Sequence, residues 1–265
     1  MRTWTQKIIS KLIFYRFYNV ANVLALILRK KNGVVPDTNL KIINKLIGKT
    51  NKSLDFYLEE LIGNKDLEDS FERFKYLYKN NKYKNYKEKI YKNLGYIALT
   101  YCVIREKKPK VVVETGTAAG SLTSFLLAAL SVNKIGRLIS IDIQPKKKNC
   151  FTYDGKLVNK ERGAFIPKKY KNRWVFISGD SKIYLPKIMQ KYNVDFFIHD
   201  SLHTYDHMSF EYYTARINMK NNTFIASDDI NNYNSSFHDF CAANKLEGWS
   251  PFLNPNFGIA KNICK

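Results

Sequence analysis

The chain has 265 residues, 45% of them hydrophobic, and a formal charge of +21 at pH 7, so it can bury one large core or a core with an extension. Residues 1–110 carry +14 of that charge, which favours anionic partners such as nucleic acid, anionic lipid or a charged glycan. The chain has no run of about twenty uncharged apolar residues and no cysteine pair with metal or disulfide spacing, which argues against a membrane span and for free thiols in a reducing, cytoplasmic compartment.

The first 85 residues are predicted to form a basic helical extension. Residues 1–32 have the pattern of a basic amphipathic helix, which either lies on an anionic membrane surface or covers its own domain or a partner in a homo-oligomer. Gly33-Val34-Val35-Pro36 is expected to break this pattern, and residues 37–80 are read as short helices. Base bias of the genome would also produce such a Lys-rich segment.

A polar junction at residues 80–89 is the best candidate for a boundary between this extension and a second domain, residues 86–265. Its tyrosines alternate with lysines, a pattern typical of single-stranded nucleic acid contacts. A solvated helix face explains the pattern better, so nucleic acid is not an expected partner.

From residue 86 onwards, helical and strand patterns alternate. The predicted helices cover 86–107, 119–132, 181–190, 204–219 and 235–245, and the predicted strands cover 110–115, 137–143, 174–177, 194–198 and 223–226, with a final antiparallel hairpin in 248–262. This alternation predicts an α/β fold with a mostly parallel sheet wound on both faces, whose ligands bind at the carboxyl ends of the strands. Residues 144–171 are a long, basic, irregular insertion, a type of segment that is usually functional or mobile.

The turn after the first of these strands has the composition of a cofactor site. A β-branched run ends in Glu114, and Gly116 and Gly120 follow with three residues between them. Glycine lets the backbone turn sharply and approach a ligand closely. The spacing differs from the Gly-x-Gly-x-x-Gly of dinucleotide enzymes, which favours S-adenosylmethionine (SAM) over NAD, with a plain strand–helix turn as the alternative. Asp142 ends the next strand, where a carboxylate can accept both ribose hydroxyls.

Three further strands end in polar residues. After the third strand, Asp180 is a candidate acceptor for an adenine amino group, and Ser181 is predicted to be a helix N-cap, which alone would explain it. Asp200 follows the fourth strand, and the adjacent Asp228 and Asp229 follow the fifth. Carboxylates this close repel unless a cation compensates, and Mg²⁺ prefers such oxygen ligands. Capping of the next helix is the alternative for the Asp228–Asp229 pair.

A histidine accompanies these acids. His203 lies three residues after Asp200 and is the candidate general base, because an imidazole titrates near neutral pH. A structural histidine remains the alternative for His203, and it is the preferred interpretation for the other three histidines. A zinc site built from the four-residue histidine spacing is disfavoured.

Taken together, these motifs resemble the class I SAM-dependent methyltransferases, in particular the branch that includes macrolide-sugar O-methyltransferases and cephalosporin-hydroxylase-like proteins. The resemblance covers about residues 90–265 and implies a Rossmann-like, seven-stranded sheet with SAM over the glycine turn. It implies a cofactor site at Glu114, Gly116, Thr117, Gly120, Ser121, Asp142, Asp180 and Ser181. It also implies metal ligands at Asp200, Asp228 and Asp229, with His203 as base.

Two positions depart from the pattern of that branch. Asp228 stands where the branch often has Glu, and its shorter side chain would alter the metal site; Ser201 stands where the branch often has Gly. The motifs and the resemblance together predict a SAM-dependent O-methyltransferase assisted by Mg²⁺ or another divalent cation. The resemblance implies that the acceptor is a hydroxyl of a sugar, a glycan or another small molecule. The alternatives are a binding protein on the same fold, docked to membrane or nucleic acid, and an NAD-linked oxidoreductase.

Overall fold

The computed structural model describes most of the chain from residue 34 onwards. The described residues are 34–75, 83–143, 150–151, 157–158, 162–230, 234–251 and 254–262. The helix predicted over residues 1–32, part of the junction at residues 80–89 and most of the insertion at 144–171 lie outside this set.

A sheet of eight strands forms the centre of the molecule, in the order β1-β9-β10-β8-β7-β2-β3-β6. The strands are β1 (Val34–Asp37), β2 (Val111–Thr115), β3 (Arg137–Asp142), β6 (Trp174–Ser178), β7 (Phe196–His199), β8 (Thr223–Ser227), β9 (Gly248–Pro251) and β10 (Gly258–Asn262). The five strands from β6 to β8 are parallel, whereas β10 is antiparallel to both β8 and β9. A separate small sheet pairs β4 (Cys150–Phe151) with β5 (Leu157–Val158).

The sheet has one strand more than the seven expected. The additional strand, β1, pairs in parallel with β9 at the edge of the sheet. It contains Pro36, which is tolerated at a sheet edge because its missing N–H is needed least there. The predicted α/β architecture and the final antiparallel hairpin are otherwise confirmed.

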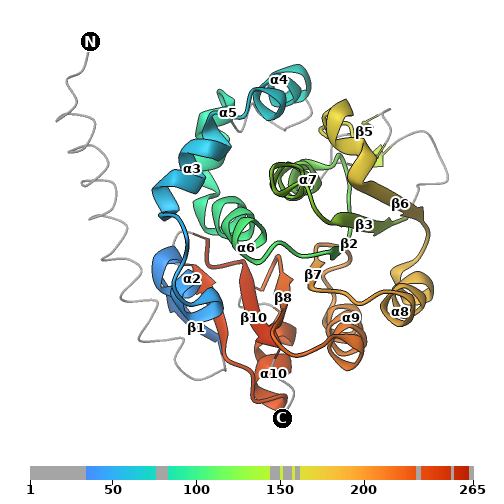
Figure 1. The fold of residues 1–265 in the computed structure, drawn as a ribbon. Coiled ribbons are helices and arrows are strands. Elements are labelled where there is room, and N and C mark those ends of the chain that lie inside the picture. The colour runs from blue at the N-terminus through green and yellow to red at the C-terminus, as the bar shows by residue number, and fades with distance from the viewer. Residues whose placement is uncertain are drawn as a thin grey trace.

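Helices cover both faces of the sheet (Figure 1). Figure 1 shows α6 and α7 on one face and α8, α9 and α10 on the other, with α3, α4 and α5 as an outer layer beyond α6 and α7. The helices are α2 (Asn39–Ile47), α3 (Leu54–Ile62), α4 (Lys65–Phe74), α5 (Tyr86–Lys92), the π-helix η3 (Leu94–Ala98), α6 (Leu99–Lys107), α7 (Ser121–Asn133), the 3-10 helix η4 (Lys168–Arg173), α8 (Ser181–Lys191), α9 (Tyr205–Asn218) and α10 (Ser236–Ala243).

The period-two pattern of the strands divides the core into two layers. Val112 of β2 packs into the cluster on the α6–α7 side, and its neighbour Val113 packs into the cluster on the α8–α10 side. Strands with apolar side chains on both faces suit a parallel sheet that is covered on both sides. The division of the chain at residue 85 stays a prediction; the described residues on both sides of it, such as Leu61 and Leu126, belong to one hydrophobic cluster.

The helix predicted over residues 86–107 is divided into α5, η3 and α6. The division falls at Asn93, whose side chain donates a hydrogen bond to the Lys89 carbonyl oxygen (2.7 Å). Among the described helices, none combines the length and the apolar character that crossing a bilayer requires.

Candidate active site

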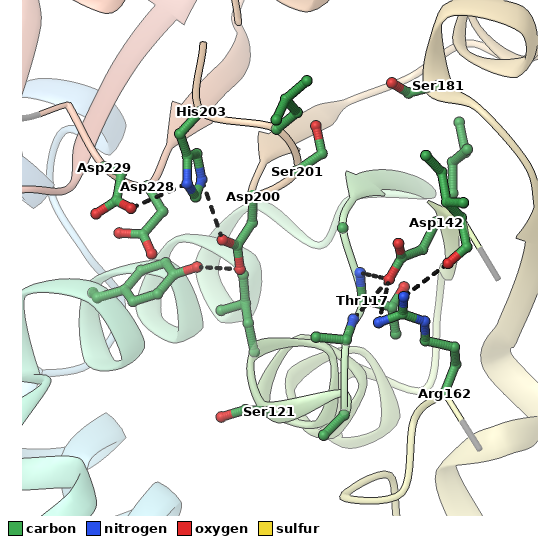
Figure 2. A pocket seen from close by; sticks show the side chains of 18 of the residues that line it. Thr117, Ser121, Asp142, Arg162, Ser181, Asp200, Ser201, His203, Asp228 and Asp229 are labelled. Atoms are coloured by element: carbon green, nitrogen blue, oxygen red, sulfur yellow. Dashed lines mark hydrogen bonds and ion pairs between the residues drawn. The ribbon is translucent and has the colours of Figure 1, made fainter. Parts of the chain in front are cut away.

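One cavity of about 720 Å³ lies at the carboxyl ends of the parallel strands, a size that suits a small-molecule site (Figure 2). Most residues of the predicted site line it, although they come from five strand ends. These residues are Gly116, Thr117, Ser121, Asp142, Asp180, Ser181, Asp200, His203, Asp228 and Asp229. Glu114 and Gly120 do not line the cavity.

The two glycines of the turn are required by contacts with other parts of the chain. Gly116 has a φ of 82°, and a Cβ atom on it would lie 1.8 Å from the carbonyl oxygen of Asp200. Gly120 has a φ of 80°, and its Cβ would lie 2.7 Å from the Cα of Gly163. Gly120 thus makes room for the segment around Gly163, whereas Gly116 joins the loops after β2 and β7.

Asp142 holds the turn through one of its carboxylate oxygens. Oδ2 accepts hydrogen bonds from the backbone N–H groups of Thr117 and Ala118, both at 2.8 Å, and pairs with Arg162 at 3.2 Å. Figure 2 shows these three interactions converging on one oxygen. Arg162 was not predicted, because nothing distinguishes it from the other basic residues of the insertion.

Glu114 lies behind the turn and not in the cavity. Its carboxyl group is fully buried and accepts hydrogen bonds from Thr123 Oγ1 of α7 and Ser140 Oγ of β3. Burial raises the pKa of Glu114 to about 8, although these two hydroxyls oppose the shift. Glu114 therefore supports the turn from behind through α7 and β3, and its predicted part in the cofactor site stays a prediction.

The start of α8 differs from the prediction. Asp180, and not Ser181, is the N-cap, and its Oδ1 accepts the backbone N–H of Lys182 at 2.8 Å. The prediction that Ser181 is the N-cap was wrong, because Asp180, one residue earlier, caps the helix instead. The Ser181 hydroxyl is instead hydrogen-bonded to His207 Nε2 at 3.0 Å.

His203 lies between two of the predicted acids. Its Nδ1 is 3.1 Å from Asp229 Oδ2, and its Nε2 is 3.8 Å from Asp200 Oδ1. These residues come together because β7 and β8 are adjacent and in register, with His199 opposite Ser227. The expected meeting of the strand-end acids at one edge of the sheet is thus observed (Figure 2).

The Asp200 carboxyl group has a strongly raised pKa. Its burial in the cavity wall raises its pKa well above the usual range, and the negative charges of Asp228, Glu114 and Asp229 raise it further. The hydroxyl of Tyr96 donates to Asp200 Oδ2 at 3.4 Å. Tyr96 was not predicted, because it comes from η3, outside the strand ends.

No group of three or more His, Cys, Asp or Glu side chains among the described residues is arranged to hold a metal ion. The three acids have the oxygen chemistry that Mg²⁺ prefers, but His203 occupies the space between Asp200 and Asp229. The predicted metal ligands therefore share one cavity without forming an assembled metal site.

A buried acid that the sequence did not single out lies beneath these loops. Glu211 of α9 is fully buried, and each of its carboxylate oxygens accepts two hydrogen bonds. Oε2 accepts from Thr115 Oγ1 and His199 Nδ1, both at 2.6 Å, and Oε1 accepts from Ser201 Oγ and His207 Nε2, both at 2.9 Å. Burial alone would raise the pKa of Glu211, but the hydrogen bonds from the two histidines hold it below the usual range.

This arrangement gives several residues a structural role. His199 and His207 are partners of a buried carboxylate, as the structural interpretation of these histidines predicted. Ser201, where the methyltransferase branch often has Gly, supplies one of the four hydrogen bonds. The contact between His207 and Glu211 could have been predicted from the sequence, because residues four apart on one helix lie side by side.

A family model and several solved structures match this chain. Residues 113–230 match the family model described as "Methyltransferase domain". No curated protein sequence matches the chain. Three solved structures have the same fold at low sequence identity.

The first is the SAH-bound methyltransferase PaMTH1 of Podospora anserina, with 11% identity, coverage of 88% of this chain and 100% of that chain, and a TM-score of 0.51. The second is an O-methyltransferase of Bacillus cereus in complex with SAH, with 14% identity, coverage of 80% and 97%, and a TM-score of 0.51. The third is TomG of Streptomyces achromogenes, an O-methyltransferase involved in tomaymycin synthesis, solved with SAM, with 14% identity, coverage of 80% and 97%, and a TM-score of 0.52. Residues 113–230 thus match a methyltransferase domain model, and the chain shares the fold of these three methyltransferases.

Proposed function

We propose that the chain is a SAM-dependent O-methyltransferase that acts on a hydroxyl group of a sugar, a glycan or another small molecule, with assistance from a divalent cation such as Mg²⁺. The observation that carries this proposal is the position of His203 among the carboxylates in the cavity that contains the glycine turn. A hydroxyl must lose a proton when it accepts a methyl group, and this part of the cavity holds the groups that can receive one.

The orientation of His203 suits a general base. Asp229 accepts the Nδ1–H, which fixes the tautomer and leaves the lone pair on Nε2. Among the described atoms, Nε2 has no hydrogen-bond partner, and it lies in the cavity wall across from Asp200. An acceptor hydroxyl that approaches Nε2 from the cavity, beside Asp200, could therefore transfer its proton to the imidazole.

The glycine turn and Asp142 provide the cofactor site. Oδ2 of Asp142 is engaged by the turn, and we assign its Oδ1 to the ribose hydroxyls. When bound, SAM would supply an electrophilic methyl group on a sulfonium that an acceptor oxygen could take up, with SAH as the leaving group. The chain contributes mainly by holding the hydroxyl and the cofactor in line and by accepting the proton.

Asp200, Asp228 and Asp229 are the candidate ligands of the divalent cation. The raised pKa of Asp200 supports this assignment, because a cation would relieve the repulsion between neighbouring carboxylates. A bound cation would also orient the acceptor hydroxyl and make it more acidic. The residues at the ends of β7 and β8 would thus hold both the cation and the base.

Two measurements test the proposal. Calorimetry should detect SAH binding to the wild type, with at least about tenfold weaker binding to Asp142→Asn, because the variant lacks the carboxylate charge. The exposed Asp239→Asn is the matched control and should bind normally. With radiolabelled SAM and a panel of hydroxyl compounds, His203→Ala should retain SAH binding and lose methyl transfer. Failure of the wild type to bind SAH, or transfer only to nitrogen or carbon, would contradict the proposal.

A further inference from the structure

A lysine from the N-terminal part of the chain reaches into the cofactor cavity. Lys89 of α5 lines the cavity although only 4% of the residue is exposed, and its Nζ donates a hydrogen bond to Ser121 Oγ. Ser121 is the first residue of α7 and directly follows the glycine turn. Lys89 lies outside residues 113–230, so the match to the methyltransferase family does not assign a role to it.

Four aromatic rings surround the ammonium group of Lys89. Its Nζ lies 5.5 Å from the ring centres of Tyr83 and Phe165 and 5.7 Å from those of Phe71 and Phe125. Such rings attract a cation through their electron-rich faces, but burial still lowers the pKa of Lys89 to about 7. An anion at Nζ would raise this pKa again and add a charge-assisted hydrogen bond.

The charges along the cavity match the charges of SAM. The carboxylates of Asp200, Asp228 and Asp229 lie on the β7–β8 side, which suits a positively charged group. Figure 2 shows Asp142 on one side of Thr117 and Ser121 on the other, so a ligand with its ribose at Asp142 can extend across the turn towards Ser121. SAM has one negative group, the α-carboxylate of its methionine moiety, at the end opposite the adenosine.

The start of α7 adds to the positive potential at this point. Ser121 begins a helix of 13 residues, and its N-cap, Gly120, provides no side-chain hydrogen bond to the helix. The backbone N–H groups of a helix N-terminus favour an anion. The helix end alone would not define a site, but here the buried Lys89 ammonium lies against it.

We infer that Lys89 and Ser121 form the carboxylate subsite of the SAM site, with Lys89 Nζ and Ser121 Oγ both donating to the α-carboxylate of the methionine moiety. The inference rests on the placement of the SAM ribose at Asp142. It makes α5, an element outside the family match, part of the cofactor site.

The test compares two ligands that differ in the methionine moiety. SAH carries the amino-acid arm with its α-carboxylate and amino group, whereas 5′-methylthioadenosine has the same adenosine and thioether without this arm. Calorimetry should show that Lys89→Met weakens SAH binding by about 10- to 100-fold, the effect of losing a charge-assisted hydrogen bond, with 5′-methylthioadenosine affinity unchanged within twofold. Ser121→Ala should show the same selectivity with a smaller loss. Lys92→Met, on the exposed side of α5 beside Glu88, is the matched control and should bind both ligands normally.

The outcomes separate this inference from the proposed function. If the wild type binds neither ligand, the placement of SAM in the cavity fails. If Lys89→Met binds SAH as tightly as the wild type, the inference that Lys89 binds the α-carboxylate is wrong. The same result is expected if Lys89 instead binds an anionic acceptor. An equal loss for both ligands would also overturn the inference, because the variant would then have damaged the whole cavity. Thermal unfolding checks that each variant is folded; should Lys89→Met not fold, the ligand selectivity of Ser121→Ala decides between these outcomes.

Discussion

The carbonyl oxygen of Asp200 occupies the place that a Cβ atom would need on Gly116, only 1.8 Å from the ideal Cβ position. The two residues follow β7 and β2, which are adjacent parallel strands, and the backbone N–H of Asp200 also donates to the Thr115 carbonyl oxygen at 2.9 Å. The turn of the proposed cofactor site and the first acid of the proposed catalytic group therefore form one packed unit. A change at Gly116 should affect both.

Gly116→Ala should impair folding and cofactor binding together. An alanine at a φ of 82° costs roughly 1 kcal/mol, and the overlap with Asp200 must add to this because backbone atoms cannot move aside cheaply. We expect a loss of about 2–4 kcal/mol in the free energy of unfolding, measured with urea, and at least tenfold weaker SAH binding.

Gly48→Ala is the matched control for this prediction. Gly48 has nearly the same φ, 84°, but nothing lies within 4 Å of its ideal Cβ position. Its ψ of −147° is a conformation essentially confined to glycine, so Gly48→Ala should lose a conformational component of about 1–3 kcal/mol and bind SAH normally. Equal losses of stability in the two variants, together with normal SAH binding by Gly116→Ala, would show that the contact with Asp200 has no energetic consequence.

Glu114→Gln should change how stability depends on pH. In the ligand-free protein Glu114 has a pKa of about 8, above its ordinary value of 4.5, so the folded state binds the proton more tightly than the unfolded state. The resulting stability is complete below about pH 4.5 and is lost as the pH rises towards 8. Glutamine stays neutral and can still bond to Thr123 and Ser140, so the variant lacks this loss.

Urea unfolding at a series of pH values measures this difference. Relative to the wild type, Glu114→Gln should gain at least about 1–2 kcal/mol between pH 4.5 and pH 8.5, since each unit of pKa displacement corresponds to about 1.4 kcal/mol. Glu247→Gln, an exposed glutamate, is the control and should track the wild type. A difference that stays constant over this range would mean that Glu114 is ionised in the folded protein.

The sequence predicted the parallel strands and the closing hairpin because their apolar runs and intervening turns are local patterns. It missed β1, whose four residues include Pro36 and whose partner, β9, lies more than two hundred residues later in the chain. Whether so short a segment forms a strand depends on the neighbouring strand with which it pairs, and its own four residues carry no information about that partner.

The same distinction separates the predicted site residues from the missed ones. Asp142, Asp200 and the Asp228–Asp229 pair were found because parallel strands bring their carboxyl ends to one edge. Arg162, Tyr96 and Lys89 reach the cavity from the insertion and from α5 and η3, so their positions depend on how those segments pack across the sheet. Nothing local distinguishes them from other residues of their type.

Glu211→Ala should destabilise the protein by about 3–5 kcal/mol at pH 7, because four donors would lose a buried charged acceptor. The pKa of Glu211 lies below 4.5 in the folded state, so its contribution is present above about pH 4.5 and is lost as the pH falls further. The gap between the variant and the wild type in urea unfolding should therefore shrink in acid. A variant as stable as the wild type at pH 7, or a gap that widens in acid, would contradict the ionised state of Glu211.

Removal of divalent cations should abolish methyl transfer and leave SAH binding unchanged within about twofold, because the acids at the ends of β7 and β8 are separate from Asp142. Addition of Mg²⁺ should restore activity and raise the melting temperature of the wild type, since an ion that binds only the folded state stabilises it. Asp228→Asn should lose most of both responses, whereas the exposed Asp206→Asn should keep them. Full activity in the presence of chelator would contradict a role for a divalent cation and would mean that the acids act only by orienting His203 and attracting the sulfonium. If Mg²⁺ still restores activity and raises the melting temperature of Asp228→Asn, the ion binds elsewhere.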